Sequence, residues 1–372
     1  MWAIAVKTLM ADRGKLLTAL VGVVFSIVLV NIQGGLFIGL VSKASILVDQ
    51  CGADIWVGHK KMNNVDFPQD VPRRWVQRIR SIEGVCRAEP YLVGQSVMTL
   101  PDGGFEPVVI VGSAPYSLLG SASNGLDASR LRVADSVVVD QGDRKKLGNP
   151  RLGDIREIGH RRARIVGFSH DILNFIVTPY VFTTIDRATG YLHKRPQDAS
   201  YFLVQVEDGA NVQQVCDRIR SRLPGAEAYS KAQYSFISMD YWLRRTGIGA
   251  SFGAATALGL IVGLVIVGQT LYASVLDRLS EFSTLKAIGA QERQIHAIIL
   301  GQAMLLAMVG SLMGLCCVVA VQHAFSTPRA TITIPWYIAA GSCLLVTVIC
   351  LCSSLLPYLR VRRIDPAMVL QG

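Results

Sequence analysis

The chain has 372 residues, of which 51% are hydrophobic and 17% are charged, and its mean hydropathy is +0.38. These values are unusual for a purely soluble protein. The formal net charge of +10 would suit a nucleic-acid partner if the basic residues formed one patch, but they are dispersed. We therefore expect no nucleic-acid partner.

Four long stretches contain no Asp, Glu, Lys or Arg. They cover residues 16–42, 246–276, 297–322 and 330–359. Each exceeds the roughly 20 apolar residues that a helix needs to cross a bilayer. We predict an α-helical membrane protein whose four transmembrane helices cover residues 16–42, 246–274, 297–322 and 335–359.

The chain opens with an amphipathic segment, residues 1–15. A helix there would place Trp2, Val6 and Leu9 on one face, which predicts a helix lying in the membrane interface and contacting lipid. The uncharged run at 16–42 is about twice the usual length of a signal-peptide core. We interpret it as an uncleaved membrane anchor.

Residues 43–245 are far too many for an ordinary connection and are enough to bury a core of their own. The predicted helices cover residues 70–82 and 210–223. The β-rich runs are DIWVG, VVIVG, SVVVD, ARIVGF, IVTPYVFTT and YFLVQV. We expect a large periplasmic α+β domain inserted between helices 1 and 2, with two subdomains and with strands 179–184 and 201–206 near its middle.

Three cysteines, Cys51, Cys86 and Cys216, lie in this domain. An odd number leaves at least one thiol unpaired within a single chain. The sequence assigns no disulfide bond.

Basic residues mark one side of the membrane. They are Lys7, Arg13 and Lys15 before the first span, Arg278, Lys286 and Arg293 between spans two and three, and Arg360, Arg362 and Arg363 after the last. The positive-inside rule makes this side cytoplasmic, so both termini, including the tail at 360–372, are expected in the cytoplasm. The connection at 323–334 is then a short periplasmic loop. Arg244 and Arg245 disagree, but they end a long loop, where the rule is weak.

The polar segment 275–296, VLDRLSEFSTLKAIGAQERQIH, separates spans two and three. Its core resembles the cytoplasmic loop of the FtsX-like permease family of ABC transporters, which reads approximately E-x-G-x-L-K/R-A-I/L-G-A. The matching residues are Glu281, Leu285, Lys286, Ala287, Ile288, Gly289 and Ala290, while Ser283 stands where the family usually has glycine. The segments 52–57 and 363–370 also resemble MacB-like and DevC-type permeases, which brackets nearly the whole chain.

The resemblance implies that 275–296 is a coupling helix seated in a cleft of a separate ATPase subunit. Phe282 is then an apolar knob, while Glu281 and Lys286 pair across the contact. Leu285 extends the apolar side, and Gly289 permits a turn before span three. The alternative interpretation is a solvated loop that merely obeys the positive-inside rule.

Glycines recur at intervals of four residues within the spans, which allows helix backbones to approach closely. The pairs are Gly35 and Gly39, Gly249 and Gly253, Gly259 and Gly263, and Gly310 and Gly314. Two interpretations stay open: a homodimer contact between spans one and two of two protomers, and packing within one protomer.

The sequence carries no P-loop, no H-E-x-x-H and no C-x-x-C pair. The uncharged spans also lack the ionisable residues typical of channels and proton-coupled carriers. We expect a transport subunit without catalytic, cofactor or metal sites of its own, in which ATP and Mg belong to the partner ATPase.

By resemblance, the chain is expected to be a permease of a bacterial inner-membrane exporter for a lipid-like or other amphipathic substrate. The implied partners are an ABC ATPase, a second permease copy, a periplasmic adaptor and an outer-membrane duct. The alternative is an FtsX-like signal coupler that transports nothing and controls an extracellular partner such as a cell-wall hydrolase. The substrate is not readable from the sequence.

Overall fold

The computed structural model describes residues 13–122, 128–277, 284, 291–327 and 332–355. Within it the chain forms two compact units. Met1–Gly39 with Gly249–Gly372 make the helix bundle, and Leu40–Ile248 make the inserted domain. Each unit is considered by itself.

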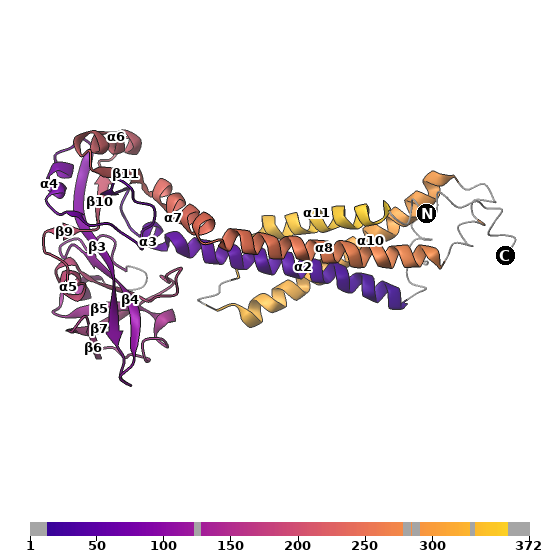
Figure 1. Cartoon of the computed structure of the whole chain (residues 1–372), viewed down its shortest axis with the longest axis horizontal. Coiled ribbons are helices and arrows are strands. Elements are labelled where there is room, and N and C mark those ends of the chain that lie inside the picture. The colour runs from indigo at the N-terminus through magenta and orange to yellow at the C-terminus, as the bar shows by residue number, and fades with distance from the viewer. Residues whose placement is uncertain (1–12, 123–127, 278–283, 285–290, 328–331, 356–372) are drawn as a thin grey trace. The chain divides into compact units, whose positions relative to one another are not determined.

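Four helices of the described chain are long and apolar enough to cross a membrane (Figure 1). They are α2 (Arg13–Val41), α8 (Ile248–Leu276), α10 (Glu292–Phe325) and α11 (Trp336–Ser353). The expected fold class, with a large α/β domain after the first helix, is confirmed. Residues 1–12, most of the expected interfacial helix, lie outside the described residues, and residues 13–15 already belong to α2.

The inserted domain is built on a mixed sheet of nine strands. Its strands are β1 (Ile55–His59), β3 (Val85–Thr99), β4 (Phe105–Ser113), β5 (Ser136–Asp140), β6 (Ile155–Ile158), β7 (Arg161–Ser169), β8 (Tyr180–Thr184), β10 (Tyr201–Val206) and β11 (Ala226–Ser230). The order is β11-β1-β10-β3-β4-β8-β5-β7-β6. A separate ladder pairs β2 (Val71–Pro72) with β9 (Asp198–Ala199).

Strand β3, with 15 residues, joins the two halves of the sheet. Its first part pairs with β10 and its second part with β4. Strand β6 pairs with the end of β3 as well as with β7, so the six strands from β3 to β6 close on themselves. The two expected subdomains are therefore halves of one continuous sheet.

Short helices cover the sheet. They are α3 (Ile46–Asp49), α4 (Trp75–Arg80), α5 (Ile185–Tyr191), α6 (Val212–Arg222) and α7 (Lys231–Arg245), with 3-10 turns η1 (Ser42–Ser45), η2 (Ala128–Arg132) and η3 (Gln141–Asp143). Asn211 caps α6, because its side chain accepts hydrogen bonds from the amides of Gln213 and Gln214. A capping box of Ser230 and Gln233 starts α7.

Alternating residues of the strands enter different cores, as the period of two in a strand requires. In β1, Ile55 and Val57 pack under α4 and α6, while Trp56 between them joins the core that contains α3 and α7. A third core fills the closed half beneath α5, around Ile110 and Val139. The β-rich runs of the sequence coincide with strands of this sheet, and strands 180–184 and 201–206 both lie in its interior.

Candidate functional site: the α2-centred helix bundle

Helix α2 contacts each of the other three long helices of the bundle. Its buried face carries Ala19, Val23 and Ile27, which are fully shielded in the bundle core. The side chains packed around them come from α8, α10 and α11. Because α2 is apolar on nearly all sides, its sequence shows no distinct hydrophobic face. Small and polar residues such as Gly22, Ser26 and Asn31 mark the side of the helix that is buried.

Helix α2 packs closely against α8. A Cβ atom added at Gly259 would overlap Leu29, and one at Gly263 would overlap the side chain of Ser26. The Ser26 hydroxyl lies 3.4 Å from the carbonyl oxygen of Gly259 and 3.0 Å from that of Gly22. The glycine pair predicted as a packing site therefore contacts the first span of the same chain.

The other predicted glycines also meet partners within the chain. Gly35 lies under Ile334, to whose side chain an added Cβ would be 2.8 Å away, and its carbonyl accepts from the amide of Thr333 at 3.3 Å. Gly39 is buried on the same face of α2. The pair Gly310 and Gly314 of α10 faces Val23 and Ile27 of α2.

A buried polar contact fixes α2 against α11. The amide nitrogen Nδ2 of Asn31 donates to the hydroxyl of Ser342 at 2.7 Å and to the carbonyl of Ile27 at 2.8 Å. Asn31 has no exposed surface. Since hydrocarbon offers no competing partner, such a hydrogen bond favours one rotational setting of the two helices.

Gly253, by contrast, does not pack against another helix among the described residues. An added Cβ at Gly253 would have nothing within 4 Å. Gly249 and Gly253 both line an apolar groove of about 390 Å³ between α2 and α8, next to the rings of Phe37 and Phe252, which lie 5.6 Å apart. The other three glycine pairs therefore pack within the chain, whereas Gly253 is exposed on α8.

The coupling residues predicted from the sequence, Glu281, Phe282, Leu285, Lys286 and Gly289, lie outside the described residues. The helices on either side of them are described. Helix α8 continues to Leu276, and α10 begins at Glu292. Lys15 of α2 forms an ion pair with Asp277 at the end of α8.

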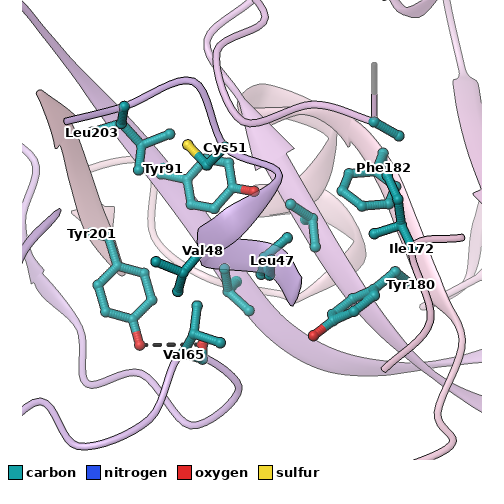
Figure 2. Packing of buried hydrophobic residues seen from close by; sticks show 14 of the residues in the cluster. Leu47, Val48, Cys51, Val65, Tyr91, Ile172, Tyr180, Phe182, Tyr201 and Leu203 are labelled. Atoms are coloured by element: carbon teal, nitrogen blue, oxygen red, sulfur yellow. Dashed lines mark hydrogen bonds between the residues drawn. The ribbon is translucent and has the colours of Figure 1, made fainter. Parts of the chain in front are cut away.

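At the opposite end, α2 continues almost without interruption into the inserted domain through η1 and α3. Leu47 and Val48 of α3 are buried in the same core as Tyr91 and Tyr201 (Figure 2). The second connection differs: α7 ends at Arg245, and Gly247 adopts a φ of +70° before α8 begins. A left-handed residue breaks the helix there, so α7 is not a rigid extension of span two.

The core around α3 is rich in aromatic rings and carries one buried acid. The Trp56 ring meets Tyr91 at 5.6 Å and Tyr201 at 5.4 Å, both edge to face. Asp66 accepts a hydrogen bond from the hydroxyl of Tyr180 at 2.6 Å. Burial, opposed by hydrogen bonds from Tyr180 and Asn174, raises the pKa of Asp66 to about 6. Reasoning from the sequence missed this acid, because its burial depends on loop packing.

All eight cysteines are described, and each is a free thiol. Within the inserted domain Cys51 and Cys216 are buried, whereas Cys86 is exposed. Burial raises the pKa of Cys51 to about 12 and that of Cys216 to about 11, so both stay protonated at neutral pH.

Family profiles match both parts of the chain. The MacB-like periplasmic core domain matches residues 16–222, and the FtsX-like permease C-terminal region matches residues 253–366. The fold and these matches define the class: a multi-pass membrane permease with a large inserted domain. Since the first match covers more than half of the chain, the chain belongs to the MacB-like family, and it is an ABC transporter permease of the MacB and FtsX type.

Individual relatives agree with this assignment. An uncharacterized ABC transporter permease of Mycobacterium tuberculosis is 26% identical over 384 residues, which cover 99% of each protein. One of Methanocaldococcus jannaschii is 22% identical over 236 residues, which cover 60% of this chain and 58% of that relative. The pyoverdine export ATP-binding/permease protein PvdT of Pseudomonas putida is 25% identical over 262 residues, which cover 66% of this chain and 38% of PvdT.

Among solved structures, the periplasmic region of MacB from Actinobacillus actinomycetemcomitans aligns with a TM-score of 0.38 at 10% identity. The alignment covers 50% of this chain and 92% of that structure.

Proposed function

We propose that this permease is the membrane subunit of an exporter that relays ATP-driven motion from a separate ATPase to the inserted domain. ATP and Mg are bound by that partner, and this chain supplies the mechanical connection. The substrate class that we propose is lipid-like or otherwise amphipathic. Export as the direction of transport is supported by the similarity to PvdT, whose name describes an exporter that also carries an ATP-binding part.

One observation carries the proposal: α2 forms an ion pair with the coupling segment near one end and continues through η1 and α3 into a folded core at the other. Lys15, near the start of α2, is paired with Asp277, which lies at the beginning of the coupling segment 275–296. At its other end the path through η1 and α3 places Leu47 and Val48 in the aromatic core of the inserted domain. Because close-packed interiors transmit displacement, a shift of α2 along its axis must move residues of that core.

The proposed topology follows from the positive-inside rule. Both termini and the coupling segment face the cytoplasm of a bacterial cell, and the inserted domain lies in the periplasm. There it would act with a periplasmic adaptor and an outer-membrane duct. Labelling with an impermeant maleimide in intact cells tests this, because Cys86 should react and a Ser283→Cys thiol should not. Labelling of both thiols from one side would contradict the proposal.

We further propose that two copies of the permease assemble along the open face of α8. Gly253 and Ala257 are exposed there, and the groove between α2 and α8 lies beside them. Small residues on an open helix face permit close contact with another helix. The three glycine pairs other than Gly249 and Gly253 are already occupied by contacts within the chain, which leaves this open face for a second copy.

Phe282→Asp tests the coupling role directly. A buried carboxylate at an apolar contact is strongly unfavourable, so this variant should insert into the membrane normally yet fail to couple ATP hydrolysis to transport. Phe282→Leu is the matched control, because it preserves an apolar knob. The assay is ATP hydrolysis and substrate release by the permease co-reconstituted with its ATPase. Normal transport by Phe282→Asp would refute the assigned role.

The same assay separates export from signal coupling. An exporter should release an amphipathic probe from the outer face of proteoliposomes when ATP is supplied. A coupler of the FtsX type should hydrolyse ATP and change the exposure of the inserted domain without moving any probe.

A further inference from the structure

The inserted domain contains a hollow of about 520 Å³ that has no part in the proposed relay. It lies between α4, the start of β3 and the loop after β4. Its lining residues are Arg80, Cys86, Arg87, Glu89, Tyr116 and Ser117. This composition is markedly polar, unlike that of the groove in the bundle.

A buried carboxylate, Glu89, lies at the hollow. The residue is 1% exposed. Its Oε2 atom accepts a hydrogen bond from the hydroxyl of Ser117, and its Oε1 atom has no hydrogen-bond partner among the described residues. The guanidinium of Arg87 is the cation paired with it, with Nε 3.8 Å from Oε1, which is too long for a hydrogen bond. One oxygen of a buried anion therefore lacks a donor, which is unfavourable unless a bound group supplies one.

Two guanidinium groups, those of Arg80 and Arg87, also line the hollow. Arg80 is held in place, because its Nε donates to the carbonyl of Ala88 at 2.8 Å and its Nη2 to the hydroxyl of Tyr116 at 3.1 Å. Arg132 fixes the loop from outside by donating to the carbonyls of Pro115 and Tyr116. The side chain of Arg87 is 52% exposed, so its charge is accessible to a ligand.

The hollow carries both positive and negative side chains, and this combination determines which ligands fit. A simple anion would suit Arg80 and Arg87 but would be repelled by Glu89, whereas a simple cation would meet the opposite conflict. A molecule with both charges, a few bonds apart, satisfies all three side chains. Charge-assisted hydrogen bonds to a carboxylate and to guanidinium groups are also the strong ones.

We propose that this hollow binds a small zwitterion, with a protonated primary amine on Glu89 Oε1 and a phosphate or carboxylate on Arg80 and Arg87. Two sources share that chemistry: a free molecule of the amino-acid or phosphoethanolamine type, and the headgroup of an aminophospholipid. The site goes beyond the proposed transport role, since it would operate in an exporter and in a signal coupler alike.

The test uses the full chain in nanodiscs of phosphatidylcholine and follows the reaction of Cys86, the exposed thiol in the hollow, with a charged maleimide. Cys86→Ser supplies the background from other thiols. O-phosphoethanolamine and L-serine are the zwitterionic probes, while ethanolamine and glycerol phosphate carry one charge type each. We expect either zwitterion to slow labelling and neither single-charge compound to do so at the same concentration.

Nanodiscs containing phosphatidylethanolamine distinguish the two sources. Protection by the lipid without added probe would identify a headgroup as the ligand. Protection only by the soluble probes would identify a free molecule.

Glu89→Gln isolates the amine contact, because it keeps the shape of the side chain and removes its charge. We expect the zwitterion to bind about tenfold more weakly, as for the loss of a hydrogen bond to a charged group. Glu83→Gln is the control, since the Glu83 side chain is 86% exposed and pairs with Arg218. The proposal is overturned if Glu89→Gln binds like the parent, if all four compounds protect equally, or if no compound or lipid protects.

Discussion

Replacing Asp66 with asparagine should stabilise the inserted domain at neutral pH. Asp66 is 2% exposed, and its Oδ1 accepts from Tyr180 at 2.6 Å and from Asn174 at 3.1 Å. Its Oδ2 has no hydrogen-bond partner in the described part of the chain. An asparagine oxygen can accept both hydrogen bonds, and no charge then has to be buried. The change removes a desolvation cost while keeping the contacts.

The size and sign of the effect follow from the pKa. Burial raises the pKa of Asp66 from 3.8 to about 6, and each unit corresponds to about 1.4 kcal/mol. The neutral carboxyl therefore favours the folded state fully below the unfolded pKa, and this contribution is lost as pH rises through about 6. Above that pH the loss amounts to roughly 3 kcal/mol. Neutral acceptors form weaker hydrogen bonds, so we expect Asp66→Asn to recover about 2 kcal/mol.

The assay is thermal unfolding of the full chain in detergent, followed by tryptophan fluorescence. Trp56, Trp75 and Trp242 report on the inserted domain. For a domain of this size, about 2 kcal/mol corresponds to a rise in Tm of roughly 4–8 °C. The difference between parent and variant should be large at pH 7.5 and nearly vanish at pH 4.5.

A surface carboxylate gives the comparison for that experiment. Asp208→Asn changes an exposed residue and should shift Tm by little at either pH. A lower Tm for Asp66→Asn at pH 7.5, or a difference that does not depend on pH, would refute the reasoning, because it would mean that the ionised carboxylate stabilises the fold.

Two further predictions concern the bundle. Gly259→Val should lower the Tm of the bundle, because the added side chain overpacks against Leu29 at a cost of about 1–3 kcal/mol. Gly253→Val is the control, because Gly253 faces open space, and it should leave the Tm of the isolated protomer unchanged. Equal effects of the two substitutions would contradict the described packing. A double-mutant cycle with Asn31→Ala and Ser342→Ala should give a coupling free energy of about 1 kcal/mol, and additive effects would mean that their 2.7 Å hydrogen bond does not hold α2 to α11.

Local features of the chain were sufficient to predict the membrane helices and most of the strands. Uncharged runs longer than a bilayer crossing leave few alternatives to a helix, because hydrocarbon cannot satisfy an open backbone. Runs such as SVVVD and YFLVQV became β5 and β10 because β-branched and aromatic side chains suit a pleated surface. The motif at 281–290 and the chain ending similarly pointed to the family.

Two features could not be predicted from the local sequence: which side chains each glycine contacts, and where a helix is interrupted. The four-residue glycine spacing indicates close packing, yet it could not say that Gly259 meets Leu29 while Gly253 faces open space. The local pattern likewise did not specify the helix break between α7 and α8, where Gly247 adopts a φ of +70°. The spacing of glycines and the length of an uncharged run are properties of a single helix. Neither shows which other helix will pack against it.

The number of spans, the presence of a folded domain after the first span and the class of transporter could therefore all be predicted from the amino-acid sequence. Long-range packing was needed to show that α2 contacts all three other long helices, that Asp66 is buried and that Glu89 and Ser117 line one hollow. This difference arises from the distance along the chain over which the interactions act. Helix formation and hydrophobic length are properties of neighbouring residues, whereas the burial of a carboxylate depends on side chains brought together from distant parts of the chain.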